Sequence, residues 1–372
     1  MRPSPKPILM ATALAVLATL STGSVAATAE PSAAPCGLAG GRAVTPFRTR
    51  RDGDGGAFFD YDVAGVIVTA PEPPPGLDLT TAPTDVLERY GLPPRPQDES
   101  EGAWIEAMRA FRSTAGAPTH TLCVDGLARP RMRGGAETQC TVSFHDCSNY
   151  AGRNATLNSY TTVTANVVIP EVPSANCAGD GHISAWVGIG TELGASGLLQ
   201  AGTITRRYEG IGNYTYAFYE WVNPPGSGNP STPPIVSAWN ASPGDTMYER
   251  VYVNTSTHGV NFFVEDVTTG QHHTATVGGL WADYDPDSAG WIVENHTATD
   301  EPNIKTGPWN WTNALLTRYS TTTYGGYTQS TDLLQGVEQG QPDYAMEIVE
   351  NATPWTSTTS FSTHWYKCRG SG

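Results

Sequence analysis

The side chains able to do acid-base, nucleophilic or metal chemistry are spread through this chain without the usual spacings. Its eight histidines are scattered, and the adjacent His272 and His273 would face opposite sides of a strand. The chain has no H-E-x-x-H string and no C-x-x-C pair, so we predict no metal site and no cofactor. It also lacks the G-x-S-x-G elbow and the D-T-G or D-S-G loops of two hydrolase classes. A Ser-His-Asp triad stays open, because its members need not be close in sequence.

Six short segments between Ser148 and Glu294 form a recognisable series. In order, they are Ser148-Asn149-Tyr150-Ala151-Gly152, Trp186-Val187-Gly188-Ile189, Leu199-Gln200-Ala201-Gly202, Tyr219-Glu220-Trp221, Ser242-Pro243-Gly244-Asp245 and Trp291-Ile292-Val293-Glu294. Each segment alone is weak, but the six in this order and spacing resemble the glutamic peptidases of the eqolisin type. The resemblance covers roughly residues 147–294, and the tail to Gly372 is less diagnostic.

This resemblance implies a fold, an activity and a catalytic pair. The implied fold is a sandwich of two antiparallel, about seven-stranded sheets, lectin-like or jelly-roll-like in architecture. The implied activity is that of an acid-acting endopeptidase that pepstatin does not inhibit. By position, the catalytic glutamine and glutamate of that family fall on Gln200 and Glu294. Without the resemblance, both would be interpreted as ordinary solvated residues of strands.

The chemistry of such a pair is consistent with acid hydrolysis of peptides. Glu294 would act as the general base on an attacking water, and a free glutamate titrates at about 4.3, close to an acidic working pH. The amide N–H of Gln200 would stabilise the oxyanion of the tetrahedral intermediate, and its carbonyl oxygen would position the water. A second Ile-Val-Glu-Asn string at Ile348–Asn351 lacks the preceding tryptophan, so Glu294 is the preferred base.

Residues around the pair are predicted to line a substrate cleft. The aromatic side chains Trp186, Phe218, Tyr219 and Trp221 would wall it, and Glu220 would support it electrostatically. Sheet packing is the alternative interpretation for each of these aromatic residues.

The chain departs from the family pattern close to this cleft. Gly190 and Ile204 stand where many members of the family have aspartate, and Phe218 stands where tryptophan is common. These changes spare the predicted pair but alter its surroundings. Gly202 lies two residues after Gln200, and its missing side chain would leave room for a substrate backbone.

The elements that position these residues are predicted to be strands. From Cys140 onward, Thr, Val, Tyr and Trp are abundant and turn residues recur about every ten positions, which is typical of an all-β fold. Alternating runs occur at 160–169, 182–189, 198–205, 214–222, 246–254, 260–267, 274–280, 291–295 and 361–366. Nine or more strands require two packed sheets or a barrel, and about 230 residues can form one such domain.

The N-terminal third is predicted to be a leader and a pro-segment. Arg2 and Lys6 precede an apolar stretch at 8–20 and small residues at 27–29, which indicates a secretory signal peptide over residues 1–29. Residues 30–139 would be a loop-rich, partly helical pro-segment that acts as an intramolecular inhibitor, and residues 140–372 the peptidase. Helical patterns occupy 84–90 and 103–112, and the stretch at 52–75 is predicted to be mostly loop. The basic cluster at 129–133 is either a cleavage region or a solvated linker.

Charge and cysteine content limit the partners and the location. The chain has 21 basic and 36 acidic residues, so nucleic acid is not an expected partner, and no later segment is apolar enough to span a membrane. Its six cysteines fit up to three disulfides in an extracellular protein, with the pairing open. We therefore expect a secreted monomer that acts on polypeptides and is most stable at low pH. The competing hypothesis is a non-catalytic, lectin-like sandwich that binds carbohydrate or peptide.

Overall fold

The fold comes from a computed structural model in which residues 33–372 form one compact unit. The expected signal peptide and the basic cluster at 129–133 lie outside the described residues. The residues that the structure describes are 36, 41–96, 101–114, 120–125, 146–147, 150–156, 159–174, 177, 179–191, 197–223, 231–254, 257, 259–278, 287–295, 304–318, 332–336, 346–349 and 360–365.

One sheet, called sheet A, carries in full four of the six segments that the sequence singled out, and the last three residues of a fifth, 150–152 on β7. Its strand order is β1-β5-β12-β11-β10-β9-β16-β7-β18-β6, and all its pairs are antiparallel except β18 with β6. The bounds are β1 Arg42–Val44, β5 Leu122–Val124, β6 Asp146–Cys147, β7 Tyr150–Thr156, β9 Gly181–Ile189, β10 Leu198–Tyr208, β11 Gly212–Val222, β12 Ile235–Val236, β16 Ser288–Asn295 and β18 Asp332–Gly336.

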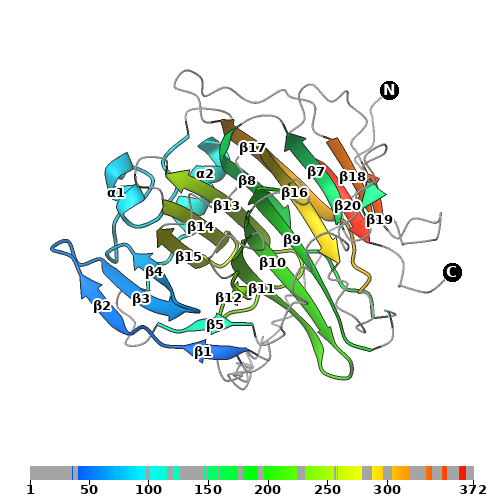
Figure 1. Ribbon diagram of the computed structural model, residues 1–372, viewed down its shortest axis with the longest axis horizontal. Coiled ribbons are helices and arrows are strands. Elements are labelled where there is room, and N and C mark those ends of the chain that lie inside the picture. The colour runs from blue at the N-terminus through cyan, green and yellow to red at the C-terminus, as the bar shows by residue number, and fades with distance from the viewer. Residues whose placement is uncertain are drawn as a thin grey trace, which may run out of the picture. The chain divides into compact units, whose positions relative to one another are not determined.

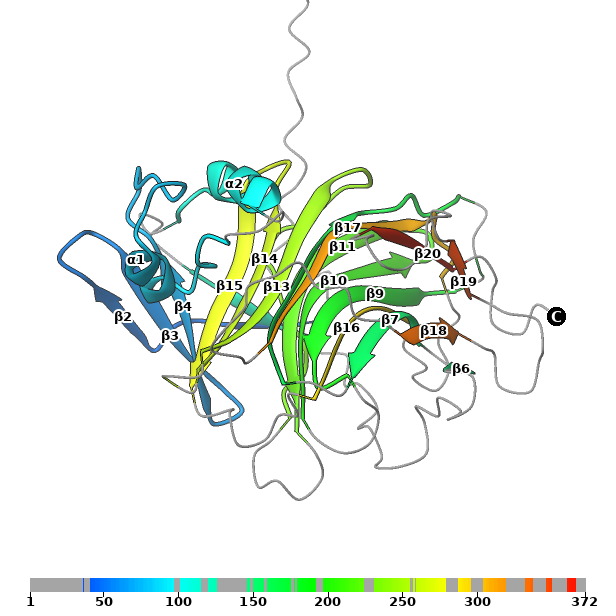
Figure 2. The same cartoon turned by 90° about the horizontal axis from the view of Figure 1, so that it is seen from above.

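The second sheet, called sheet B, packs against sheet A (Figures 1 and 2). Its order is β19-β20-β17-β8-β13-β14-β15-β4-β3-β2, with antiparallel pairing throughout the described strands. The bounds are β2 Arg48–Arg51, β3 Ala57–Val63, β4 Val66–Glu72, β8 Tyr160–Val168, β13 Thr246–Asn254, β14 Gly259–Asp266, β15 Gln271–Gly278, β17 Trp309–Arg318, β19 Met346–Val349 and β20 Phe361–Trp365. The prediction of an all-β sandwich is confirmed.

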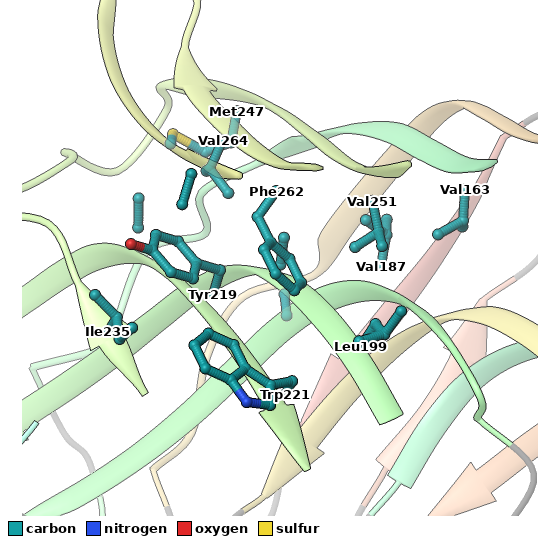
Figure 3. Close-up of a cluster of buried hydrophobic side chains, with 14 of the residues drawn as sticks. Val163, Val187, Leu199, Tyr219, Trp221, Ile235, Met247, Val251, Phe262 and Val264 are labelled. Atoms are coloured by element: carbon teal, nitrogen blue, oxygen red, sulfur yellow. The ribbon is translucent and has the colours of Figure 1, made fainter. Parts of the chain in front are cut away.

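Each described sheet has ten strands where about seven were expected. The N-terminal third supplies much of the difference, because β1 and β5 extend sheet A and β2 to β4 extend sheet B. Each of the nine predicted runs overlaps a strand, and 246–254 coincides with β13. Their alternating apolar residues meet between the sheets in one hydrophobic core, part of which Figure 3 shows around Phe262 and Val251.

The expectation of a mostly loop-like stretch at 52–75 is wrong, because β3 and β4 form a hairpin there. Ala64 and Gly65 form its two-residue turn with φ of 54° and 86°, as a tight hairpin with right-handed strand twist requires. Phe59 and Tyr61 of β3 enter the main core. The glycine and proline clusters that suggested a loop flank two apolar runs that are long enough to pair.

The rest of the N-terminal segment is held to both sheets. Strand β5 pairs with β12, and β4 pairs with β15. Helix α1, Thr84–Arg89, and helix α2, Glu101–Ala110, pack with Tyr248 and Phe263 on the outer side of sheet B. A disulfide joins Cys36 to Cys123 within the segment. Segment and sandwich therefore share sheets and core, while the boundary predicted at residue 139 falls outside the described residues.

A buried carboxylate reinforces this attachment. Glu72 at the end of β4 lies 2.8 Å from Nε2 of His272 on β15 and 3.4 Å from Nε2 of His120. Burial by itself would raise the pKa of Glu72, but the charge of His272 and the hydrogen bonds of both histidines outweigh burial and hold that pKa well below its usual range. A carboxyl group whose pKa is lowered by folding stabilises the folded protein at pH values above the pKa of the unfolded chain. This contribution is lost only in stronger acid, as the pH falls towards the folded-state pKa. The link therefore persists at mildly acidic pH.

No helix among the described residues has the length and apolar character that crossing a membrane requires.

Candidate active site

The strand pattern of sheet A places Gln200 and Glu294 on the same face. Their neighbours Leu199, Ala201 and Val293 point into the core between the sheets. Because successive side chains of a strand alternate, Gln200 of β10 and Glu294 of β16 project from the opposite, outer face of sheet A. This face is called the site face below. Both side chains are buried there, with exposed fractions of 0% and 4%.

Trp186 of β9 occupies the position between the two. In the strand register Gly202 of β10 and Ile292 of β16 stand opposite Trp186, one on each side. Gln200 stands opposite Gly188, two residues from Trp186 towards one end of β9. Glu294 stands opposite Ser184, two residues from Trp186 towards the other end of β9. The predicted pair therefore sits on a diagonal with the indole of Trp186 at its middle.

The indole of Trp186 contacts Glu294 and lies over Gly188. Its Nε1 donates a hydrogen bond to Oε2 of Glu294 at 3.1 Å. Its six-membered ring leans over Gly188, the residue opposite Gln200, so that a Cβ on Gly188 would lie 2.8 Å from Cζ3 of Trp186. Trp186 thus fixes one oxygen of Glu294 and fills the floor beside Gln200.

Gly202 has a different role from the one expected. A Cβ at this position would lie 2.1 Å from the carbonyl oxygen of Ala185 and 2.5 Å from Cα of Trp186. The missing side chain makes room for the backbone of β9 and for Trp186, so the prediction that it makes room for substrate is wrong.

Glu220 of β11 contacts Gln200 directly. The two residues are opposite each other in the register of β10 and β11, and Nε2 of Gln200 donates to Oε2 of Glu220 at 2.6 Å. Both are buried. Oε1 of Gln200 has no hydrogen-bond partner in the described structure. This glutamine is therefore held by one bond and presents an unsatisfied acceptor.

Two of the five predicted cleft residues lie elsewhere. Tyr219 and Trp221 point into the core between the sheets, where both stack on Phe262 (Figure 3). The prediction that they wall the cleft is corrected for a geometric reason: three consecutive strand residues cannot all face one side. Phe218 and Trp186 do lie on the site face, within one buried cluster that also contains Ile292.

The departures from the family pattern have structural reasons at two positions. Gly190 has a φ of 85°, and a Cβ there would lie 2.1 Å from the carbonyl oxygen of Gly197, so an aspartate does not fit this backbone. Ile204 is buried in the same apolar cluster as Trp186 and Phe218. An apolar contact thus replaces a carboxylate at this edge of the site.

A buried ion pair at the end of β10 was not predicted. Arg206 lies on the site face, four residues beyond Gly202, and its guanidinium donates to the carboxylate of Asp125 just after β5. Because 81 residues separate them, no local pattern signals the pair. Among the described residues, no three His, Cys, Asp or Glu side chains are grouped so as to hold a metal ion.

Comparisons with known proteins identify the family of this chain. The sequence model of the Peptidase A4 family matches residues 148–367. Aspergillopepsin-2 of Aspergillus niger is 29% identical over 178 residues, which is 43% of this chain and 60% of that protein.

Two solved structures of peptidases are similar to this chain at lower sequence identity. Scytalido-glutamic peptidase with a peptide-based transition state analog matches with a TM-score of 0.45 and 19% identity, over 59% of this chain and 98% of its own. SCP-B, a member of the eqolisin family of peptidases bound to the tripeptide Ala-Ile-His, matches with a TM-score of 0.43 and 19% identity over the same shares.

A two-sheet sandwich with Gln200 and Glu294 on one face of sheet A is the arrangement that the resemblance of the six segments implied. The match of the family model to most of the sandwich goes further, and the chain belongs to the Peptidase A4 family. The resemblance seen in the six segments is thereby confirmed.

Proposed function

We propose that this protein is a secreted, acid-acting endopeptidase in which Glu294 is the general base and Gln200 stabilises the oxyanion. The observation that carries the proposal is the placement of these two side chains on one face of sheet A, across Trp186. Its substrates are polypeptides, and it needs no cofactor. The predicted signal peptide supports an extracellular location, and we take the protein to be a monomer.

The reaction follows from what each group can do. Glu294 removes a proton from a water molecule as the water oxygen bonds to the scissile carbonyl carbon. The carbonyl oxygen becomes an oxyanion, which accepts a hydrogen bond from the amide nitrogen of Gln200. The C–N bond then breaks, and the proton held by Glu294 passes to the leaving nitrogen. The N–H of Trp186 holds one carboxylate oxygen in place, so the reacting carboxylate is positioned beforehand.

The environment of the pair supports this division of roles. A carbonyl carbon above Trp186 would have Glu294 on one side and Gln200 on the other. Gln200 donates one amide hydrogen to Glu220, which leaves the second hydrogen of the same nitrogen for an oxyanion. The apolar side chains of Phe218 and Ile204 on the same face would contact substrate side chains next to the scissile bond.

Digestion of casein at acidic pH tests this function. The secreted protein should cleave casein in acid, and pepstatin should not slow the reaction, because the site lacks the paired aspartates that pepstatin-sensitive enzymes share. Porcine pepsin in the same assay gives the control for inhibition. Complete absence of cleavage by the fully processed protein would instead support a non-catalytic sandwich that only binds peptide or carbohydrate.

We further propose that residues 30–139 are a pro-segment that inhibits the enzyme before processing. Two contacts support this: the buried pair of Asp125 with Arg206 on the site face, and the packing of the Cys36–Cys123 disulfide in the same apolar cluster as Trp186 and Phe218. Both contacts join the N-terminal segment to residues on the site face of sheet A.

Incubation of the zymogen in acid tests the pro-segment. We expect the mass to fall to a species that begins between Arg129 and Cys140, with activity rising in parallel. Gel filtration then shows whether the N-terminal piece leaves, since its strands are paired with both sheets. A zymogen of unchanged mass with full activity would reject an inhibitory role.

A further inference from the structure

We infer that Glu220 is a positioning residue that fixes the amide of Gln200 in the orientation that peptide hydrolysis requires. The inference rests on the proposed function, because it assigns the cause of the orientation of one of the two proposed catalytic groups. It changes the expected role of Glu220 from a general electrostatic support to a specific hydrogen-bond acceptor.

The contact between the two side chains is built into the sheet. Gln200 and Glu220 face each other directly across the β10–β11 pair, and their side chains project from the same face. The distance of 2.6 Å between Nε2 and Oε2 is short for a hydrogen bond between nitrogen and oxygen. The exposed fractions are 0% for Gln200 and 2% for Glu220, so water does not compete freely for this bond.

The chemistry of a carboxylate determines which way the amide points. Oε2 of Glu220 accepts the hydrogen bond in this contact, so the NH₂ end of Gln200 faces it and the oxygen end is turned away. The terminal torsion of a glutamine is otherwise broad and roughly two-fold, so the two ends would exchange readily. Oε1 of Gln200 is therefore turned away from Glu220, and it is buried without a partner in the described structure.

This orientation matches the needs of the proposed reaction. The unsatisfied Oε1 is an acceptor for a hydrogen of the attacking water, and leaving such a buried acceptor unpaired is unfavourable until a water or substrate arrives. The second hydrogen of Nε2 remains for the oxyanion. If the amide were reversed, an oxygen would face the developing negative charge and repel it.

Substitution of Glu220 tests the inference. In Glu220→Gln the acceptor and donor ends of residue 220 can both meet Gln200, so the amide loses its preferred direction. We expect kcat to fall about 10- to 100-fold, as loss of a charge-assisted hydrogen bond implies, with KM changed less than about two-fold. Glu220→Asp keeps the charge one methylene further back, and its kcat should lie between the two.

A double-substitution cycle separates positioning from a general structural effect. The measured quantity is the affinity for a peptide inhibitor with a tetrahedral hydroxyl centre in place of the scissile carbonyl. Glu220→Gln should weaken binding about ten-fold in the natural protein and less than two-fold in the Gln200→Ala background, because Glu220 then has no amide to orient. Equal weakening in both backgrounds would overturn the inference.

Glu249→Gln is the matched control, since it also removes a fully buried carboxylate but from sheet B. Its kcat in acid should equal that of the natural protein.

A natural kcat in Glu220→Gln, with Gln200→Ala inactive, would overturn this inference and leave the proposed function standing. Full activity in Gln200→Ala would overturn the proposed function itself. Unfolding midpoints show that each variant is folded under the assay conditions.

Discussion

Replacing Glu294 by glutamine is expected to abolish peptide hydrolysis, with kcat lowered by at least about 1000-fold. A positioned general base contributes about 10²- to 10⁴-fold to a rate, and an amide cannot take the proton of the attacking water. The substitution keeps the size of the side chain, and the N–H of Trp186 can still donate to the amide oxygen at position 294. The fold should therefore survive while catalysis is lost.

Initial rates on casein and on a short peptide measure this effect, with the unfolding midpoint as a check of structure. The matched control is Glu350→Gln, which alters the glutamate of the second Ile-Val-Glu-Asn string and lies outside the described residues. It should keep full activity. An active Glu294→Gln together with an inactive Glu350→Gln would show that the base had been assigned to the wrong string.

Replacing Glu249 by glutamine is expected to raise stability at neutral pH and leave it nearly unchanged in acid. Glu249 points from β13 into the core beside Met247 and Val251, and neither carboxylate oxygen has a hydrogen-bond partner among the described residues. Burial raises the pKa of Glu249 well above its usual range. The folded protein therefore keeps this side chain protonated at a pH where the unfolded chain has released the proton.

The sign of the pH effect follows from this difference. A raised pKa contributes full stability below the pKa of the unfolded chain, about 4.3, and the contribution is lost as the pH rises towards the folded-state value. By pH 7 the loss reaches at most about 4 kcal/mol, and glutamine at position 249 removes it because it does not titrate. The lowered pKa of Glu72 changes the free energy of unfolding with pH in the opposite direction. This effect is the same in the natural protein and in Glu249→Gln, so it cancels when the two are compared.

Urea unfolding at acidic and neutral pH measures the free energy of unfolding of both proteins. The variant should show a flatter dependence on pH. Glu209→Gln is the control, since it removes one negative charge from an exposed residue of the β10–β11 turn and should leave the dependence intact. If Glu209→Gln flattens the curve as much as Glu249→Gln, the acid preference comes from net charge and not from the buried carboxyl.

Much of the sandwich could be predicted because strands carry a local signal. The alternation of Ala185 and Val187 with Trp186 indicates two faces, and the structure keeps that assignment. The same alternation could have corrected the prediction for Tyr219 and Trp221. Both residues are direct neighbours of Glu220 on β11, so their side chains must point to the face opposite to that of Glu220.

Other features had no local signal. The pair of Arg206 with Asp125 and the contact of Glu72 with His272 join residues 81 and 200 positions apart. Such contacts depend on which strands become neighbours, and that depends on the whole topology. The hairpin of β3 and β4 was missed for a different reason, since flanking glycines and prolines outweighed two short apolar runs.

One of the two described edge strands of sheet B, β2, has a consequence for the behaviour of the protein at high concentration. Strand β2 is Arg48-Thr49-Arg50-Arg51, and every residue in it is exposed. An open sheet edge is a template for pairing with another molecule, and a row of like charges repels a second copy that approaches in register. Arg48 and Arg50 share the single carboxylate of Asp60, so the strand keeps an excess of positive charge. Because arginine stays protonated over the whole range of assay pH, this excess opposes edge-to-edge pairing in acid and at neutral pH alike.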